Sequence, residues 1–147
     1  TTPYLVIDYS LTMALTSAAK SGVDVRIITP HIPDKKTVFE MTRSHYEELL
    51  GAGVQIFEYE PGFIHSKNFV VDDRFATVGT VNLDYRSLFL HFEDGVWLCE
   101  APCIRDIRKD FEATLECSEP YSLRQFKHLN ILLQLYRSIL RVFAPLM

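Results

Sequence analysis

Tyr4-Leu5-Val6-Ile7 is the first of three apolar runs that decide the fold class, and residues 23–28 and 54–59 are the other two. Each run has the length and composition of a buried strand. A helical pattern joins each run to the next. The first is capped by Asp8 or Ser10 and ended by Gly22, and the second is capped by Asp34 and ended by Gly51 and Gly53. This order predicts an α/β fold with a mixed, mostly parallel β-sheet flanked by helices on both faces.

The second half of the chain predicts an antiparallel addition to this sheet. Apolar runs at residues 67–71 and 75–78 are separated by Asp72-Asp73-Arg74, which is typical of a hairpin. A last strand is expected at 96–99, and helices at about 102–116 and 122–144. We expect residues 1–120 to form the body of one domain, with residues 121–147 as a C-terminal amphipathic helical extension of it.

Composition limits the class of partner. The chain has 147 residues, 48% of them hydrophobic, which is enough material for one domain with a buried core. Its net charge of −4 makes nucleic acid a disfavoured partner. Three cysteines, Cys99, Cys103 and Cys117, lie outside any zinc-type spacing, so we expect free thiols and no metal. The opening Thr1-Thr2-Pro3 has neither Met nor a signal segment, and we expect the chain to be part of a longer protein.

Two polar motifs carry the chemistry. The first is His65-Ser66-Lys67 followed after four residues by Asp72, and the second is Gly79-Thr80-Val81-Asn82. On a strand His65 and Lys67 point to one side, so an imidazole and an ammonium group meet one ligand. Lysine binds the non-bridging oxygens of a phosphodiester, and imidazole serves as a nucleophile or a proton carrier near neutral pH. The spacing therefore predicts an enzyme that breaks phosphodiester bonds.

The other site residues support this pair. Thr80 and Asn82 place a hydroxyl and an amide on the same phosphate, while Gly79 allows a close backbone approach. A histidine in this role needs an acceptor on its other nitrogen, and Glu93 is the candidate. Asp72 belongs to the signature, but a turn-stabilising role is favoured over direct chemistry. The alternative for His65 is a core histidine that donates to a carbonyl, which the second motif makes less favoured.

These residues resemble the phospholipase D superfamily and, within it, the bacterial cardiolipin synthases. The similarity is carried by residues 61–67 and 79–87, and it extends to Thr2-Pro3-Tyr4, residues 22–28, residues 42–44 and residues 48–54, a pattern similar to the C-terminal half of those enzymes. Two positions differ from the family pattern. Ile7 stands where a proline is expected, and His91 stands where an asparagine is usual, although an ordinary loop histidine is the favoured reading of His91.

The resemblance implies a metal-independent transfer without a cofactor. One motif's histidine attacks phosphorus to give a phosphatidyl-histidine intermediate, and a second motif's histidine protonates the departing alcohol. In the synthases two phosphatidylglycerol molecules give cardiolipin and glycerol. On the family pattern Lys67 and Asn82 bind phosphate and Glu93 orients His65, which in a C-terminal copy favours an acid/base role. The implied catalytic set is thus His65, Lys67, Asp72 and Glu93, and the phosphate-binding set is His65, Lys67, Thr80 and Asn82.

The chain contains a single His-x-Lys, whereas the family uses two per active site. The resemblance therefore implies that residues 1–120 form a phospholipase D-like catalytic half-domain with one motif. The second is expected from another half-domain of a longer chain or from a homodimer, and the isolated segment is expected to be inactive or nearly so. Residues 131–143 predict an amphipathic helix that is too polar to span a membrane; it suits either the surface of an anionic membrane or packing on the missing half. We expect the whole protein at the bacterial membrane and this segment to be soluble.

Two functional alternatives stay open. The first is another phosphodiesterase of the superfamily, either a phospholipase or a nuclease, since the chemistry at phosphorus is the same. The acidic balance of residues 1–120, with 11 basic against 19 acidic residues, disfavours the nuclease. The second is a non-catalytic module that binds phosphate or lipid headgroups.

Overall fold

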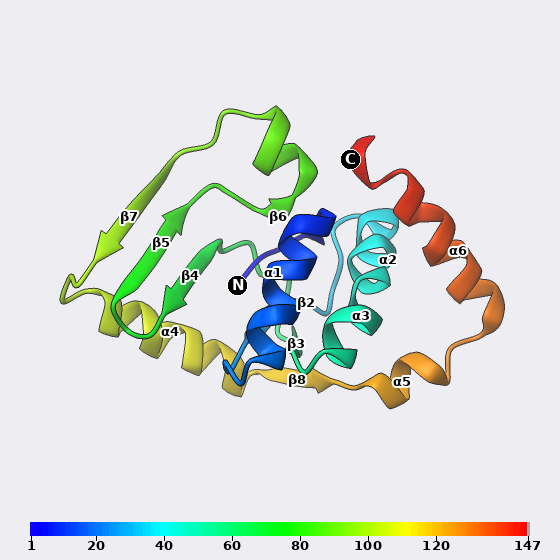
Figure 1. Ribbon diagram of the computed structural model, residues 1–147, viewed down its shortest axis with the longest axis horizontal. Helices are drawn as coiled ribbons and strands as arrows, with labels where there is room; N and C mark the ends of the chain where they lie inside the picture. Colours follow the sequence, from blue (N-terminus) through cyan, green and yellow to red (C-terminus); the bar gives the residue numbers. More distant parts are fainter. Residues whose placement is uncertain (147) are drawn as a thin grey trace.

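The structure is a computed structural model and describes residues 1–146. Figure 1 shows a hairpin region at one end, a central group of strands and helices, and a helical arm at the other end. The elements in chain order are β1 (Leu5–Val6), α1 (Tyr9–Lys20), β2 (Arg26–Pro30), α2 (Lys36–Ser44), α3 (Tyr46–Gly51), β3 (Gln55–Tyr59), β4 (Asn68–Val71), β5 (Phe75–Gly79), β6 (Leu83–Asp84), η1 (Arg86–Leu90), β7 (Gly95–Cys99), α4 (Ile104–Glu116), β8 (Ser118–Tyr121), α5 (Leu123–Lys127), α6 (Ile131–Val142) and η2 (Ala144–Leu146).

The α/β class is confirmed, but the strands are not clearly mostly parallel as the sequence predicted. Within residues 1–146 the strands form three groups, ordered β1-β6, β2-β3-β8 and β4-β5-β7. The β1–β6 and β2–β3 pairs are parallel, whereas β3–β8, β4–β5 and β5–β7 are antiparallel. The parallel part follows from the strand-helix-strand order, and the short turn at residues 72–74 makes β4 and β5 an antiparallel hairpin.

The segment Thr1–Ile7 runs between these groups and touches each of them. The backbone nitrogen of Thr1 donates to the carbonyl of Asn68 in β4 at 2.8 Å, and Thr2 N donates to Ile28 O in β2 at 3.0 Å. Leu83 N in β6 donates to Thr2 Oγ1 at 3.1 Å, so one buried threonine serves two strands. Backbone groups that are buried need such partners, and here the first residues of the chain provide them.

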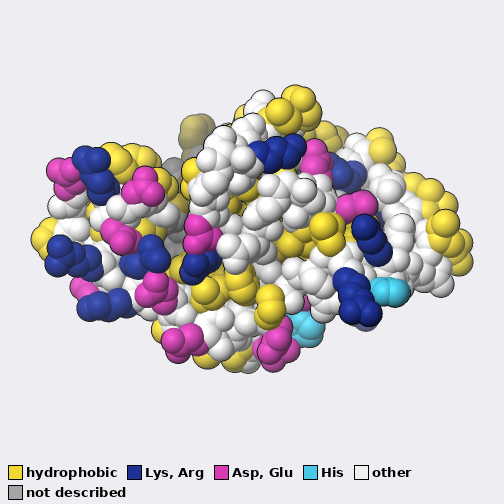
Figure 2. Space-filling view, turned by 60° about the horizontal axis from the view of Figure 1, so that its bottom comes forward, with side chains coloured by type: hydrophobic (Ala, Val, Ile, Leu, Met, Phe, Trp, Pro, Cys, Tyr) yellow, Lys and Arg dark blue, Asp and Glu magenta, His cyan; other side chains and the backbone are white. Residues whose placement is uncertain are grey.

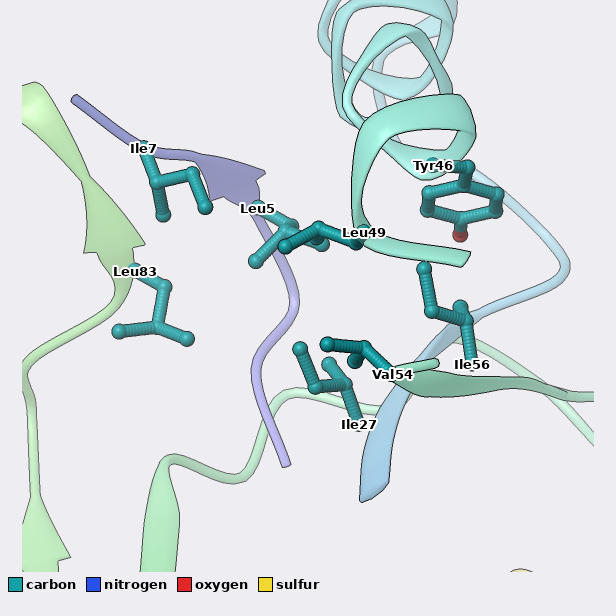
Figure 3. Close-up of a cluster of buried hydrophobic side chains, with 8 residues drawn as sticks. All are labelled: Leu5, Ile7, Ile27, Tyr46, Leu49, Val54, Ile56 and Leu83. Carbon is teal, nitrogen blue, oxygen red and sulfur yellow. The ribbon is translucent and has the colours of Figure 1, made fainter. Parts of the chain in front are cut away.

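The hydrophobic core lies around this segment. Eight buried side chains from β1, β2, α3, β3, β6 and the short links between them form one cluster (Figure 3), namely Leu5, Ile7, Ile27, Tyr46, Leu49, Val54, Ile56 and Leu83. The Leu49 side chain from α3 lies over Leu5 in this view. Burial of side chains of this size contributes roughly 1.5–3 kcal/mol each relative to exposure.

Helix boundaries follow the predicted caps in one case and depart from them in another. Asp8 caps α1 as predicted, because its carboxylate accepts from Leu11 N at 2.8 Å. Asp34 does not cap α2: its carboxylate accepts a 2.5 Å hydrogen bond from the Tyr4 hydroxyl instead. The predicted helix after it is divided at His45 into α2 and α3.

A polar network is buried where β2 and β3 end. The Glu58 side chain is 4% exposed and accepts from Arg43 through both carboxylate oxygens, at 2.8 and 2.6 Å. The Tyr46 hydroxyl donates to the same carboxylate at 3.2 Å, and His31 Nδ1 lies 2.9 Å from it. A buried carboxylate is stable only with such partners, so this network ties α2 and α3 to the sheet.

The C-terminal helix was predicted as one unit over residues 122–144, and that is wrong: it is divided into α5 and α6 at residues 128–130. The side of α6 that faces the rest of the domain is also not the one we expected. Arg137 is buried and donates to Glu40 at 2.7 Å, and Arg141 donates to Glu48 at 3.1 Å, so the basic side of α6 faces α2 and α3.

The apolar side of α6 is turned outward. Its exposed side chains are Ile131, Leu132, Leu135, Tyr136, Ile139, Val142 and Phe143. Hydrophobic side chains gather along the right edge of the view in Figure 2, the end at which Figure 1 places α6. At the opposite end of the same view, acidic and basic side chains are intermixed, so that surface is not uniformly cationic. No helix within residues 1–146 has the length and apolar character to cross a membrane.

His45 gives the fold a predictable response to acid. Its side chain is buried between α2 and α3, neither ring nitrogen has a hydrogen-bond partner within residues 1–146, and burial lowers its pKa to about 3, with Arg141 adding to the effect. The unfolded chain binds a proton near pH 6.5 that the folded chain does not, so the free energy of unfolding decreases as pH falls from about 6.5 toward 3.

Urea unfolding between pH 7 and pH 4 measures this slope. We expect His45→Leu to flatten it, because the variant has no proton to bind on unfolding. The matched control is His128→Leu, which removes an exposed histidine and should keep the slope of the parent chain. An equal slope for His45→Leu and the parent would contradict the assignment.

Candidate active site

His65 and Lys67 lie together directly ahead of β4. The predicted strand begins one residue later than expected, at Asn68, but the two side chains still share one side of the chain. Lys67 Nζ donates to the carbonyl of His65 at 2.7 Å and lies 2.9 Å from His65 Nδ1 and 3.1 Å from Nε2. His65 is exposed, and its ring packs against Phe63 with a centroid separation of 5.6 Å. The predicted pairing of an imidazole and an ammonium group is thus present at the surface.

Two carboxylates influence the pKa of Lys67. Partial burial lowers the pKa of the ammonium group, and the negative charges of Glu93 and Asp84 oppose that shift. Glu93 is therefore close enough to Lys67 for the two charges to interact, although the two residues are far apart in the sequence. Asp84 is buried in β6, where its carboxylate accepts from Ser87 N at 2.7 Å.

Glu93 is held by the second motif. Its carboxylate accepts a hydrogen bond from the Thr80 hydroxyl, and the hydroxyl groups of Thr80 and Ser87 hold the pKa of Glu93 below its usual value. Thr80 also receives a hydrogen bond from Asp94 N at 2.9 Å, and its own backbone N donates to Asp94 O at 2.8 Å. Thr80 thus joins the end of β5 to the loop that carries Glu93.

Gly79 has a packing role that the sequence did not indicate. A Cβ at this position would clash with the backbone of Asp94 and Gly95, because β5 and the start of β7 approach closely here. We expected the glycine to allow approach to a phosphate; in the structure it allows approach of the Glu93–Asp94 loop. The absent side chain is therefore what brings Glu93 beside Thr80.

Asn82 contacts the segment that follows the second motif. Its amide nitrogen donates to Ser87 Oγ at 3.2 Å, and its Oδ1 is buried without a partner within residues 1–146. Ser87 thus lies between Asn82 and Glu93, a link that sequence reasoning missed. The available signal was its position in the same motif, five residues after Asn82.

Asp72 is not part of this cluster. It lies in the β4–β5 turn, where both Asp72 and Asp73 have positive φ angles of 51° and 54°. Lys67 precedes β4 and Asp72 follows it, so five extended residues, about 16 Å, separate them. The position of Asp72 supports a role in stabilising the turn, because Asp tolerates the left-handed conformation that the turn requires. It does not support the direct chemical role that the resemblance implied for Asp72.

The arrangement suits chemistry on a phosphodiester. An imidazole, an ammonium donor and an ionised carboxylate come together from the His65–Lys67 segment and the Glu93 loop, and the Asn82 amide is linked to the carboxylate through Ser87. Within residues 1–146 no group of three or more potential ligand side chains is arranged for a metal ion.

Comparisons with known proteins show the family to which the chain belongs. Residues 1–115 match the family model described as "Cardiolipin synthase, PLD-like domain", where PLD stands for phospholipase D. Cardiolipin synthase 2 of Bacillus anthracis is 42% identical over 146 residues, covering 99% of this chain and 28% of that protein. Cardiolipin synthase of Geobacillus thermodenitrificans is 41% identical over 145 residues, covering 99% of this chain and 29% of that protein. The chain thus spans less than a third of these relatives.

Solved structures share the fold at lower identity. The phospholipase D family member Nuc from Salmonella typhimurium superposes with a TM-score of 0.71 at 18% identity, covering 82% of this chain and 79% of that one. Phosphatidylserine synthase from Haemophilus influenzae gives a TM-score of 0.72 at 18% identity, covering 99% of this chain and 38% of that one. With the family model matched over most of its length, the chain belongs to the phospholipase D superfamily, as a cardiolipin synthase phospholipase D-like domain.

Proposed function

We propose that this chain is one catalytic half of a cardiolipin synthase, in which two phosphatidylglycerol molecules give cardiolipin and glycerol. The observation that carries the proposal is the convergence of His65, Lys67 and Glu93 with the Thr80–Asn82 loop on one open surface. The family match and the relatives named cardiolipin synthase support the choice of substrate.

The phosphate of the donor lipid would bind at the Lys67 ammonium group. In the structure the ammonium group donates a hydrogen bond to the His65 carbonyl, and a phosphate oxygen can replace that carbonyl as the acceptor. The Asn82 amide and the Thr80 hydroxyl, which donate to Ser87 and Glu93 in the structure, would supply neutral donors once they turn from these acceptors to the phosphate. Because Lys67 is only half-buried and charged, it contributes positive charge without closing the site to lipid.

The reaction needs two imidazoles. In the first step one imidazole attacks phosphorus, the bond from phosphorus to the glycerol oxygen breaks, and the second imidazolium gives its proton to that oxygen. In the second step the now neutral imidazole takes the proton of the acceptor phosphatidylglycerol hydroxyl, whose oxygen attacks phosphorus while the phosphorus–nitrogen bond breaks. We assign His65 the acid/base role in this sequence.

Glu93 would act as a positioning residue for His65. Its carboxylate is kept ionised by the hydroxyl groups of Thr80 and Ser87, and an ionised carboxylate stabilises an imidazolium that has taken up a proton. The carboxylate also lies within the electrostatic reach of Lys67, so the charges of the site are balanced before substrate binds.

The second imidazole would come from a second His-x-Lys motif. His65 lies on an open surface, and the exposed side chains of Phe92, Val96 and Trp97 flank Glu93 along the chain. A partner domain that covers these apolar side chains would also exclude water from the phosphorus centre. This partner is another half-domain of the longer protein or a second copy of this chain.

The role of His65 is tested in the full-length protein with phosphatidylglycerol vesicles and mass spectrometry of the products. We expect His65→Ala to reduce cardiolipin formation by about 100- to 10,000-fold, the usual contribution of an acid/base group. In the His65→Ala variant, lipid donors whose leaving group departs without taking up a proton should restore much of the rate that the first step has lost. His128→Ala, outside the site, is the control and should keep full turnover; equal turnover in both variants would reduce the chain to a binding module.

The requirement for a second motif is tested with the 147-residue chain itself. We expect the chain alone to form no cardiolipin, because it supplies one imidazole where two are needed. Addition of a separately purified upstream half should restore product, and an upstream half whose own motif histidine is replaced by Ala should not. Turnover by the isolated monomer would contradict the two-imidazole mechanism.

The outward apolar side of α6 is proposed as a contact with the lipid surface that holds the substrate. Since Arg137 and Arg141 are paired with Glu40 and Glu48, the contact would be mainly apolar and not electrostatic. We expect binding to phosphatidylglycerol vesicles in flotation assays to change little with salt, and to be lost in the combined variant Leu132→Ser, Leu135→Ser and Ile139→Ser.

Two observations complete this flotation test. The control variant replaces exposed Lys127 with Ser and should float as the parent does, and circular dichroism confirms that both variants keep the fold. Undiminished flotation of the triple variant would instead assign this side of α6 to the partner half-domain.

A further inference from the structure

A small cavity lies where the end of α2 meets α3, α5 and α6. It has a volume of about 90 Å³. In Figure 1 α5 and α6 form the arm at the end of the molecule opposite the β4-β5-β7 group. The residues that line the cavity belong neither to the His65–Lys67 segment nor to the Thr80–Asn82 loop. Its polar lining residues are Ser44, Glu47, Gln134, Arg137, Ser138 and Arg141.

The buried guanidinium group of Arg137 is the reason to expect a ligand in this cavity. The Arg137 side chain is 3% exposed, and its Nε donates to Glu40 Oε2 at 2.7 Å. Its Nη1 is buried and has no hydrogen-bond partner within residues 1–146. The guanidinium carbon lies 5.9 Å from the centre of the Phe126 ring, which lines the same cavity. A buried cationic donor without an acceptor is rare, and an acceptor in the cavity would satisfy it.

The neutral side chains of the lining use their own donors on the backbone. Ser44 Oγ donates to Met41 O at 2.6 Å, and Ser138 Oγ donates to Gln134 O at 3.0 Å. Gln134 Nε2 donates to Leu129 O at 3.1 Å. The guanidinium groups are therefore the strong donors that remain for a ligand, and a ligand that binds to them must supply acceptors.

Arg141 adds a second positive charge to the cavity. It lies one helical turn after Arg137 on α6, and residues four apart share one side of a helix. Its Nη2 donates to Glu48 at 3.1 Å, and this ion pair is partly exposed to solvent. A guanidinium group presents a planar fork of donors, which matches the oxygens of a phosphate group. Two such groups at one cavity therefore favour an oxyanion.

Size and charge narrow the ligand further. The cavity is far smaller than a pocket for a drug-sized molecule, about 300–1,000 Å³, and larger than the roughly 30 Å³ that one water occupies. It therefore admits a group of the size of one phosphate. Glu40 and Glu48 already accept hydrogen bonds from the two arginines. Glu47 lines the cavity from an exposed position, so its carboxylate opposes an anion, and solvent screens this repulsion only in part.

We propose that this cavity is a second anion site, which binds a phosphate-type oxyanion between Arg137 and Arg141. Nη1 of Arg137 would donate to the buried oxygen of the anion, and Arg141 would hold an oxygen nearer to solvent. Free phosphate and the phosphate of a lipid headgroup both offer this chemistry. A bound anion would join α6 to α3 and stabilise the position of α6. The site does not depend on which reaction takes place at His65.

Calorimetric titration of the full-length protein with inorganic phosphate tests the site. All titrations use the Lys67→Ala background, which weakens phosphate binding at the candidate active site. We expect Arg137→Lys to raise the Kd at least about tenfold, because lysine lacks the planar fork, and Arg141→Gln to raise it roughly fivefold. Glu47→Gln should lower the Kd about two- to fivefold, because it removes the opposing charge. The control Lys127→Ser removes an exposed cation outside the lining and should leave the Kd unchanged.

Arg141→Gln and Glu47→Gln decide the question even if Arg137→Lys does not fold, because both side chains reach solvent. Opposite changes of the Kd in these two variants, with no change in Lys127→Ser, support the site. The same Kd in every variant would mean that the cavity holds water alone, and this would overturn the proposal. A parallel titration with glycerophosphoglycerol separates the two sources: the same pattern of variants with this soluble headgroup supports a lipid ligand, and binding of inorganic phosphate alone supports the free ion.

Discussion

The structure depends on the buried segment Thr1–Ile7, whose backbone joins strands that have no other neighbour in common. Through Thr1 and Thr2 it bonds to β4, β2 and β6, and Leu5 N donates to Thr42 Oγ1 of α2 at 3.1 Å. Its apolar side chains enter the same core that α3 and β3 share. Hydrogen bonds hold the strands in register, and the burial of Leu5 and Ile7 stabilises the arrangement.

The candidate active site is possible because three segments distant in the sequence meet at the edge of this frame. The His65–Lys67 segment enters β4, the Thr80–Asn82 loop leaves β5, and the Glu93 loop enters β7. Pairing of β5 with β7 brings Gly79 against Gly95, and the lack of a side chain at Gly79 lets the Glu93 carboxylate reach the Thr80 hydroxyl. The chemistry therefore rests on hairpin register, because a shift of one residue would turn these side chains away from one another.

The arrangement of α6 shows how charge and hydrophobicity can be divided between the inside and the outside of a protein. Its two arginines face glutamates of α2 and α3, while its leucine and isoleucine side chains face outward. Such an orientation leaves an exposed apolar surface, and a surface of this kind is typical of a contact with a membrane or with another protein domain. The ion pairs fix the orientation of the helix, since Arg137 would otherwise be buried without an acceptor.

Local patterns in the sequence determined the α/β class, the Asp8 cap, the β4–β5 hairpin and the pairing of His65 with Lys67, because each depends on residues close together in the chain. Tertiary structure alone decided the balance of parallel and antiparallel pairs and the division of α2 from α3 at His45. It also decided that Asp34 accepts a hydrogen bond from Tyr4 instead of capping a helix. The distance of Asp72 from the site and the inward orientation of the α6 arginines depend on tertiary structure as well. The position of Ser87 between Asn82 and Glu93 also belongs to this second group. Each of these features depends on a partner far away in the sequence. Periodicity and capping describe only a residue's own neighbourhood, whereas a buried charge or an unpaired strand edge is satisfied by whatever group the folded chain brings to it.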